Sequence, residues 1–126
     1  MKIVIITGNN YPCGDAGAVR QHAMAKLLMD MGHDVFVIGY GPYTGNKEKV
    51  YDSVPYISFR KKSNNRIIRA FYRVNFGSRV VAYIKKHHQD LNCLLVVDVL
   101  PNAFKKIEKL AQDKNALLIH DSVEWY

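Results

Sequence analysis

Residues 1–40 read MKIVIITGNNYPCGDAGAVRQHAMAKLLMDMGHDVFVIGY and set the architecture of the chain. Residues 2–7 are a short apolar run, residues 8–15 a loop with two glycines, residues 16–31 a helical pattern, and residues 35–40 a second apolar run. This order predicts a βαβ unit of a parallel sheet. Its loop and helix N-terminus then lie at the carboxyl edge of the sheet, where open α/β folds bind ligands. Because a helix N-terminus offers free N–H groups, we expect a site for a small anionic ligand there.

The rest of the chain continues the alternation of strands and helices. Apolar runs at residues 54–59, 94–99 and 116–119 predict three further strands, with helices over residues 64–88 and 102–113. We expect Gly77 and Ser78 to divide or bend the longer helix. Strands that alternate with helices predict an α/β fold: a Rossmann-like parallel sheet with right-handed crossovers and helices on both faces.

Helical spacing also predicts the ends of the first helix and the buried faces of the first two. Asp15 is placed to cap the first helix, and Gly32 to close it in a left-handed conformation. The side chains expected to face the core from the first helix are Val19, Ala23, Met24, Leu27, Leu28 and Met31. Those expected from the second helix are Ile67, Phe71, Val74, Val81 and Ile84.

Length and composition are those of one globular domain. The 126 residues include 48% hydrophobic and 23% charged residues, enough for a hydrophobic core. No apolar run approaches the roughly 18 residues that cross a bilayer, and residues 2–7 are too short for the apolar part of a secretory signal. Cys13 and Cys93 stand far apart without a pairing pattern, which indicates reduced thiols in a cytosolic protein.

Positive charge is concentrated in one segment. The net charge is +7, yet residues 60–89 hold nine Lys or Arg and no Asp or Glu, leaving nine cations against eleven acids elsewhere. Aromatic and aliphatic residues are interleaved with these cations, which favours an amphipathic helix at an anionic membrane surface. A solvated helix face ranks second and nucleic-acid binding third, because no nucleic-acid-binding motif accompanies the charges. The candidate membrane-facing residues are Lys61, Lys62, Arg66, Arg69 and Arg73.

The loop over residues 8–17 matches neither common phosphate-binding motif. Asn10 breaks the pattern G-x-G-x-x-G, and no Gly-Lys-Ser/Thr follows. The second strand ends without an acid that would hold a ribose hydroxyl, which argues against NAD. Gly14 and Gly17 nevertheless let backbone approach a ligand closely. Arg20, one turn into the helix, could reach a phosphate with its planar guanidinium, although a solvated surface arginine is an equal alternative.

Polar residues gather where the last predicted strand ends. His120 and Asp121 lie at its carboxyl end, on the sheet edge that also holds the glycine-containing loop. A carboxylate near an imidazole can orient it and raise its basicity, but neighbours on a strand point to opposite faces. Glu124 is a further candidate, and a simple strand exit is the alternative.

Several stretches together resemble the N-terminal domain of glycosyltransferase family 4 enzymes, which have the GT-B fold. The first is the opening strand with its Pro12-x-Gly14 loop. The second is Ala16-Gly17-Ala18-Val19-Arg20 with the Leu27-Leu28 helix. Gly32-His33-Asp34-Val35, LLVVD at residues 94–98 and LLIHDSVEWY at residues 117–126 complete the match, which is weak in the middle of the chain.

The resemblance implies an acceptor-side domain that faces a donor-binding second domain across a cleft. Gly14, Asp15, Ala16 and Gly17, with Arg20, would then approach the diphosphate or sugar of a nucleotide-sugar donor. His120, Asp121 and Glu124 would face a glycan or lipid-linked acceptor as the catalytic candidates. The resemblance implies no metal or other cofactor, no nucleic-acid partner, and a cytoplasmic position that can be peripheral to the inner membrane face. It also points to bacterial cell-surface polysaccharide synthesis.

The second domain and its donor-binding carboxylates are not in this sequence. We therefore expect residues 1–126 to be one domain of a longer enzyme, inert alone, and to self-associate through an unfinished edge near Ile119 and Trp125. The competing class is a stand-alone α/β module that binds a nucleotide or another anion without catalysis. A flavodoxin-like receiver ranks lower because no acidic pair follows the first strand.

Overall fold

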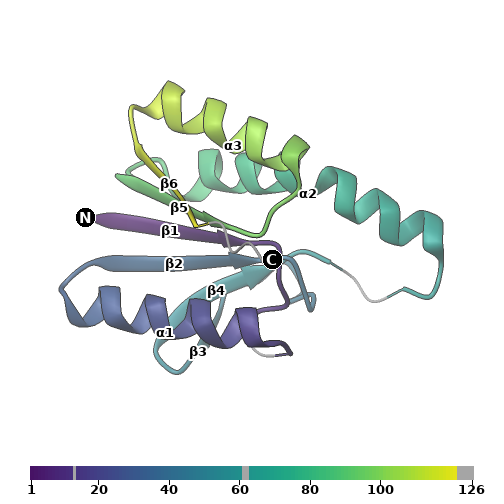
Figure 1. Ribbon diagram of the computed structural model, residues 1–126, viewed down its shortest axis with the longest axis horizontal. Coiled ribbons are helices and arrows are strands. Elements are labelled where there is room, and N and C mark those ends of the chain that lie inside the picture. The colour runs from purple at the N-terminus through teal and green to yellow at the C-terminus, as the bar shows by residue number, and fades with distance from the viewer. Residues whose placement is uncertain (13, 61–62, 122–126) are drawn as a thin grey trace, which may run out of the picture.

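A computed structural model describes residues 1–12, 14–60 and 63–121 of the chain (Figure 1). In chain order the elements are β1 (Lys2–Thr7), α1 (Ala16–Asp30), β2 (Asp34–Gly39), β3 (Lys49–Tyr51), β4 (Val54–Ser58), α2 (Arg66–His87), β5 (Cys93–Val97), α3 (Pro101–Lys114) and β6 (Leu117–Asp121). None of the helices in the described ranges is long and apolar enough to cross a membrane.

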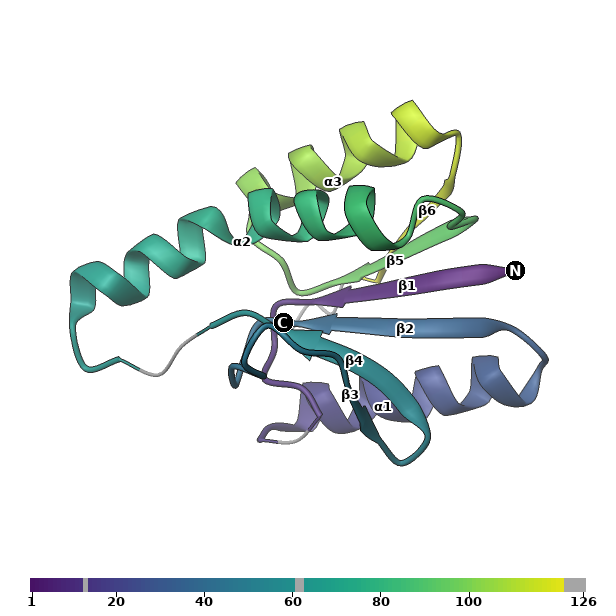
Figure 2. The same ribbon diagram turned by 180° about the vertical axis from the view of Figure 1, so that it is seen from behind.

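The six strands form one sheet in the order β3-β4-β2-β1-β5-β6. All neighbouring pairs are parallel except β3 with β4. α1 covers one face of the sheet, and α2 and α3 cover the other (Figures 1 and 2). The predicted α/β, Rossmann-like architecture is confirmed. The strand order reverses direction between β1 and β5, which defines the crevice where such sheets bind ligands.

The antiparallel strand β3 was not predicted from the sequence. It pairs with β4 through a tight turn in which Asp52 and Ser53 have φ angles of 47° and 70°. Two successive left-handed residues are typical of a hairpin turn, but they are usually Asn or Gly. β3 is short and fully exposed, so it carries no hydrophobic alternation that would mark it.

The ends of α1 follow the prediction, whereas its buried face differs. Asp15 Oδ1 accepts a hydrogen bond from the Ala18 N–H at 2.7 Å, and Gly32 closes the helix with a φ of 93°. The fully buried residues are Ala18, Gln21 and Ala25, with Met24 and Leu28 packed partly against the core. Four of the predicted core residues are exposed instead: Val19, Ala23, Leu27 and Met31. Two of the three fully buried residues are alanines, whose small side chains let the helix approach the sheet closely.

The prediction for the buried face of α2 was wrong in its N-terminal half. The helix runs without a break from Arg66 to His87, and its first turns project beyond the sheet (Figure 2). Ile67 is 80% and Phe71 63% exposed, and Val74 is exposed as well, whereas Ile84 is buried as expected. Gly77 does not divide the helix: a Cβ there would lie 2.6 Å from the Ala103 Cα, so glycine allows α2 and α3 to touch.

Candidate functional site

The crevice between β1 and β5 is closed by direct backbone contact. The Gly8 N–H donates to the Val97 carbonyl at 3.0 Å. A Cβ on Gly8 would lie 1.9 Å from the Asp98 carbonyl oxygen, so this position requires glycine. Asp98 follows β5 and has a φ of 51°, a left-handed conformation that aspartate tolerates better than most residues. The turn places the exposed Asp98 side chain above the switch point.

A chain of side-chain amides joins this crevice to α1. Thr7 Oγ1 donates to Gln21 Oε1 at 3.0 Å, and the Asn9 Nδ2 group donates to Asp98 Oδ2 at 3.2 Å and to Gln21 Oε1 at 3.4 Å. Gln21 is 1% exposed, so this network fixes the Asn9 amide from below. Gly17 makes room for it, because a Cβ there would lie 2.5 Å from Asn9 Nδ2.

An open hollow of about 500 Å³ lies over this network at the N-terminus of α1. The residues lining it are Asn9, Asp15, Ala16, Gly17, Arg20, Gln21 and Asp98. The predicted loop residues Asp15, Ala16, Gly17 and Arg20 therefore do surround a common space. Gly14 is exposed beside it, with a φ of 137°.

Arg20 crosses from α1 to the end of β6. Its guanidinium forms a 2.8 Å ion pair with Asp121 Oδ2, and its side chain is 48% exposed. His120 points to the other face of the sheet, where its ring packs 4.6 Å from that of Phe104 on α3. The structure thus separates His120 from Asp121, as strand alternation requires. Glu124 lies outside the described residues.

The hollow and the adjacent ion pair carry more negative than positive charge. Asp15, Asp98 and Asp121 face a single cation, Arg20. The carboxylates and the Asn9 amide oxygen can accept hydrogen bonds, which suits a ligand rich in hydroxyl groups. A free phosphate would meet repulsion here unless Arg20 exchanged Asp121 for it.

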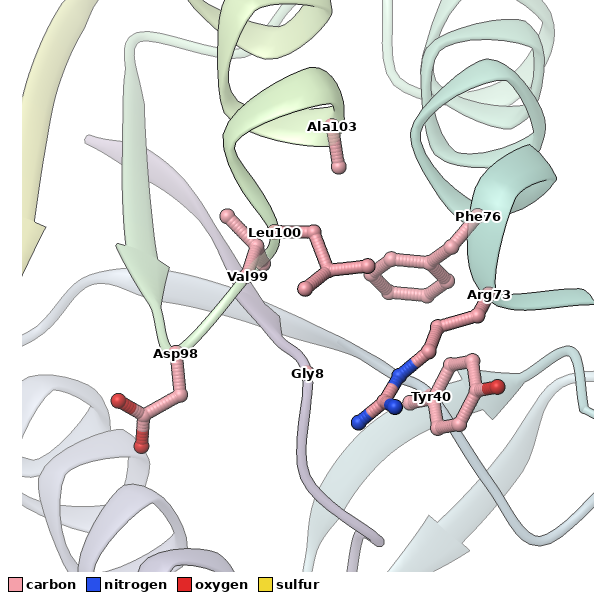
Figure 3. A pocket seen from close by; sticks show the side chains of 8 residues that line it. All are labelled: Gly8, Tyr40, Arg73, Phe76, Asp98, Val99, Leu100 and Ala103. Carbon is pink, nitrogen blue, oxygen red and sulfur yellow. The ribbon is translucent and has the colours of Figure 1, made fainter. Parts of the chain in front are cut away.

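A smaller apolar slot of about 60 Å³ adjoins Asp98 on the other side of Gly8 (Figure 3). Val99, Leu100, Phe76 and Ala103 form its apolar wall, and Tyr40 and Arg73 close its far end. In Figure 3 the Arg73 side chain extends from α2 toward the ring of Tyr40, while Asp98 points away from both. The slot therefore lies between the acidic hollow and the positively charged part of α2.

A second polar chain near the glycine-containing loop has a structural role. Tyr11 Oη lies 2.7 Å from His22 Nδ1, and His22 Nε2 lies 3.0 Å from Asp52 Oδ2. The hydrogen bond from His22 lowers the pKa of Asp52, and burial raises the pKa of Tyr11. Tyr11 is fully buried and cannot meet a substrate. This Asp-His-Tyr chain ties the loop to the β3–β4 turn.

Sequence reasoning missed three residues of the site: Asn9, Gln21 and Asp98. The sequence did contain a signal for Asp98, since it is the first polar residue after a buried strand.

The predicted membrane-facing residues Lys61 and Lys62 lie outside the described residues. In the described part of the chain, no three His, Cys, Asp or Glu side chains are grouped so that they could hold a metal ion.

Solved structures that share this architecture include the following two. The C-terminal domain of a hydrogenase from Pyrococcus furiosus is 16% identical, with a TM-score of 0.66 over 95% of this chain and 89% of that one. A glycosyltransferase from Rickettsia africae ESF-5 is also 16% identical, with a TM-score of 0.54 over 94% of this chain. What this chain shares with the glycosyltransferase is the α/β, Rossmann-like fold. The chain spans only 29% of that enzyme's length.

No family model and no curated protein matches the chain. At 16% identity the two structural neighbours establish the fold alone, and they do not extend to family 4 in particular. Any activity must therefore be argued from the residues at the carboxyl edge of the sheet.

Proposed function

We propose that this chain is the acceptor-side domain of a glycosyltransferase. The enzyme would transfer a sugar from a nucleotide-sugar donor to a glycan or lipid-linked acceptor, and this domain alone would be inert. The observation that carries the proposal is the polar hollow at the β1–β5 switch point of a glycosyltransferase-like fold. Both the resemblance in sequence and the shared architecture support it.

The charge of the hollow favours the acceptor side over the donor diphosphate. Asp98 and Asp121 offer carboxylate oxygens to hydroxyl donors, and one of them could accept a proton from an attacking hydroxyl. Asp121 fits this role better than His120, whose ring packs on Phe104 and faces the opposite side of the sheet. Glu124 remains a candidate from the resemblance.

A donor phosphate could still approach the glycine-containing loop from a second domain. Ala16 and Gly17 begin α1, and the dipole of a helix favours negative charge at its N-terminus. Arg20 would contribute by exchanging its Asp121 partner for the phosphate. This exchange would couple donor binding to release of the Asp121 carboxylate.

The projecting half of α2 supports a place at a membrane surface. Ile67 and Phe71 are exposed beside Arg66 and Arg69, which is the composition of an interfacial helix. Lys61 and Lys62 precede it in the sequence and would add to the attraction for anionic lipids. We therefore propose a peripheral position on the cytoplasmic membrane face.

Ligand titration of the isotope-labelled chain tests the site. UDP-glucose, GDP-mannose and free hexoses should shift the amide resonances of Asn9 and Gly17. Asp98→Asn should weaken those shifts, whereas Asp113→Asn, an exposed carboxylate on α3, should leave them unchanged. Equal effects of the two variants, or no shifts at all, would argue against the hollow as a sugar site.

Two further measurements test the division into domains. A transfer assay with the 126-residue chain alone should yield no product; significant transfer would refute the inert-alone proposal. The gene beyond the Tyr126 codon should encode a second Rossmann-like domain with a pair of glutamates. A stop codon, combined with tight nucleotide binding, would favour the stand-alone binding module instead.

A further inference from the structure

Four arginines line one open pocket beside the apolar slot. The pocket has a volume of about 360 Å³ and lies between the carboxyl ends of β2 and β4 and the projecting half of α2. Its lining consists of Tyr40, Arg60, Arg66, Arg69, Ala70 and Arg73, which we call the arginine pocket. Arg60 follows β4, and the other three arginines come from successive turns of α2.

No acidic side chain among the described residues offsets this charge. None lines the pocket, and the ion pairs found in the described ranges use Lys2, Arg20, His22 and Lys26 instead. The first turn of α2 also contains no acid, although a helix N-terminus favours negative charge. Arg66 and Arg69 are therefore held near each other and near a positive helix end, an arrangement that an anion would stabilise.

Arg60 is held in place more firmly than a surface arginine. Its backbone N–H donates to the Tyr40 carbonyl at 2.7 Å, and its guanidinium carbon lies 5.3 Å from the centre of the Tyr40 ring. Within the described residues its buried Nε has no hydrogen-bond partner. A buried donor without a partner is costly, and a bound oxygen atom that reached it would remove that cost.

We propose that the arginine pocket binds a phosphate or diphosphate group. Guanidinium groups match phosphate oxygens with paired, charge-assisted hydrogen bonds, and four of them suit a doubly or triply charged group better than a single carboxylate. Phosphate binding itself does not depend on glycosyl transfer.

The position of the pocket suggests what carries the phosphate. Tyr40 and Arg73 line both the arginine pocket and the apolar slot, and Asp98 lines both the slot and the acidic hollow. The three spaces therefore adjoin one another, with a positively charged end at the arginine pocket and a hydroxyl-binding end at the hollow. This extension rests on the proposed function: the acceptor is a phosphorylated or diphosphate-linked glycan, with its phosphate at Arg73 and its sugar near Asp98.

Calorimetry with inorganic pyrophosphate tests the pocket directly. The unmodified chain should bind pyrophosphate, and the variant Arg69→Gln/Arg73→Gln should bind it at least about tenfold more weakly, since each lost charge-assisted bond is worth roughly tenfold or more. Lys105→Gln, an exposed cation on α3, should change the affinity less than about twofold. Absence of binding, or an equal loss in Lys105→Gln, would overturn the proposal. Both arginines are exposed, so the melting temperature should confirm that the variant folds.

Neutral vesicles that contain a prenyl diphosphate distinguish the two sources of the group. Tighter binding to these vesicles than to pyrophosphate would assign the phosphate to a lipid-linked ligand, and equal binding to a water-soluble one. Amide shifts should map to Arg60 and Ala70 in either case. Tighter, pocket-dependent binding of an oligonucleotide than of pyrophosphate would overturn the small-ligand proposal in favour of nucleic acid. If pyrophosphate binds but sugars do not shift the Asn9 amide resonance, the phosphate-binding proposal stands and the proposed glycosyltransferase function fails.

Discussion

Replacing Gly77 by alanine sets two effects of known size against each other. In a helix interior, alanine in place of glycine stabilises by about 1 kcal/mol. At Gly77, however, the new methyl group would lie 2.6 Å from the Ala103 Cα and 3.0 Å from its Cβ. Ordinary contact begins near 3.4 Å, so the two helices must separate by about 0.8 Å. Forcing a methyl group into close-packed structure costs typically 1–3 kcal/mol.

We therefore expect Gly77→Ala to lower the free energy of unfolding by up to about 2 kcal/mol, since the cost of packing exceeds the gain in helix propensity. Urea denaturation followed by circular dichroism measures it. Ala82→Gly, at an exposed position of the same helix, calibrates propensity alone and should cost about 1 kcal/mol. Adding Ala103→Gly should recover part of the loss. Stabilisation by Gly77→Ala would refute the close contact between α2 and α3.

Three further predictions concern stability and association. Burial, followed by the charge of Lys2, lowers the pKa of His88. Below about pH 6.5 the unfolded chain therefore binds a proton that the native state does not, so the free energy of unfolding should fall from pH 7 to pH 5. In His88→Leu this fall should be less steep. Asp15→Ala removes the cap of α1 and should cost about 1 kcal/mol by urea denaturation, whereas Asp30→Ala at the other end should not. Ile119 is 43% exposed on the edge strand β6 and should promote self-association of the chain. The prediction is contradicted if the chain and its Ile119→Asp variant both sediment as monomers at high concentration.

The order of elements could be predicted because each strand is a nearly continuous apolar run. Runs such as residues 93–97 are buried on both faces of a parallel sheet, and no other soluble structure suits them as well. Capping by Asp15 and closure at Gly32 are local effects, so they too could be read from neighbouring residues. The position of the site at the carboxyl edge followed from topology alone.

The buried faces of α1 and α2 could not be predicted because periodicity fixes a face only when the other faces are polar. α1 has apolar residues all round, and the sheet selected its small ones, Ala18 and Ala25, over Val19 and Leu27. On α2 the apolar pattern runs past the end of the sheet. Helical periodicity does not indicate where the sheet beneath a helix ends. Ile67 was therefore predicted to be buried, although the core does not extend to it.

The site residues missed from the sequence depend on contacts between distant segments. The Asn9 amide takes its place in the hollow only because Gly17 leaves room for it and because Asp98, 89 positions away, accepts its hydrogen bond. By contrast, the separation of His120 from Asp121 could be predicted, because neighbouring side chains on a strand point to opposite faces.

The overhang of α2 divides one helix into two dynamic regimes. Around Val80 and Ile84 the backbone amides are covered by core, and they should exchange with solvent deuterium only on opening of the domain. From Arg66 to Phe71 the backbone is held by the hydrogen bonds of the helix itself. Those amides should therefore exchange rapidly, through local fraying of the helix end. A single uninterrupted helix should thus show a sharp boundary in protection near Phe76. A bound polyanion, by bridging the arginines, should move that boundary toward the N-terminal end of the helix.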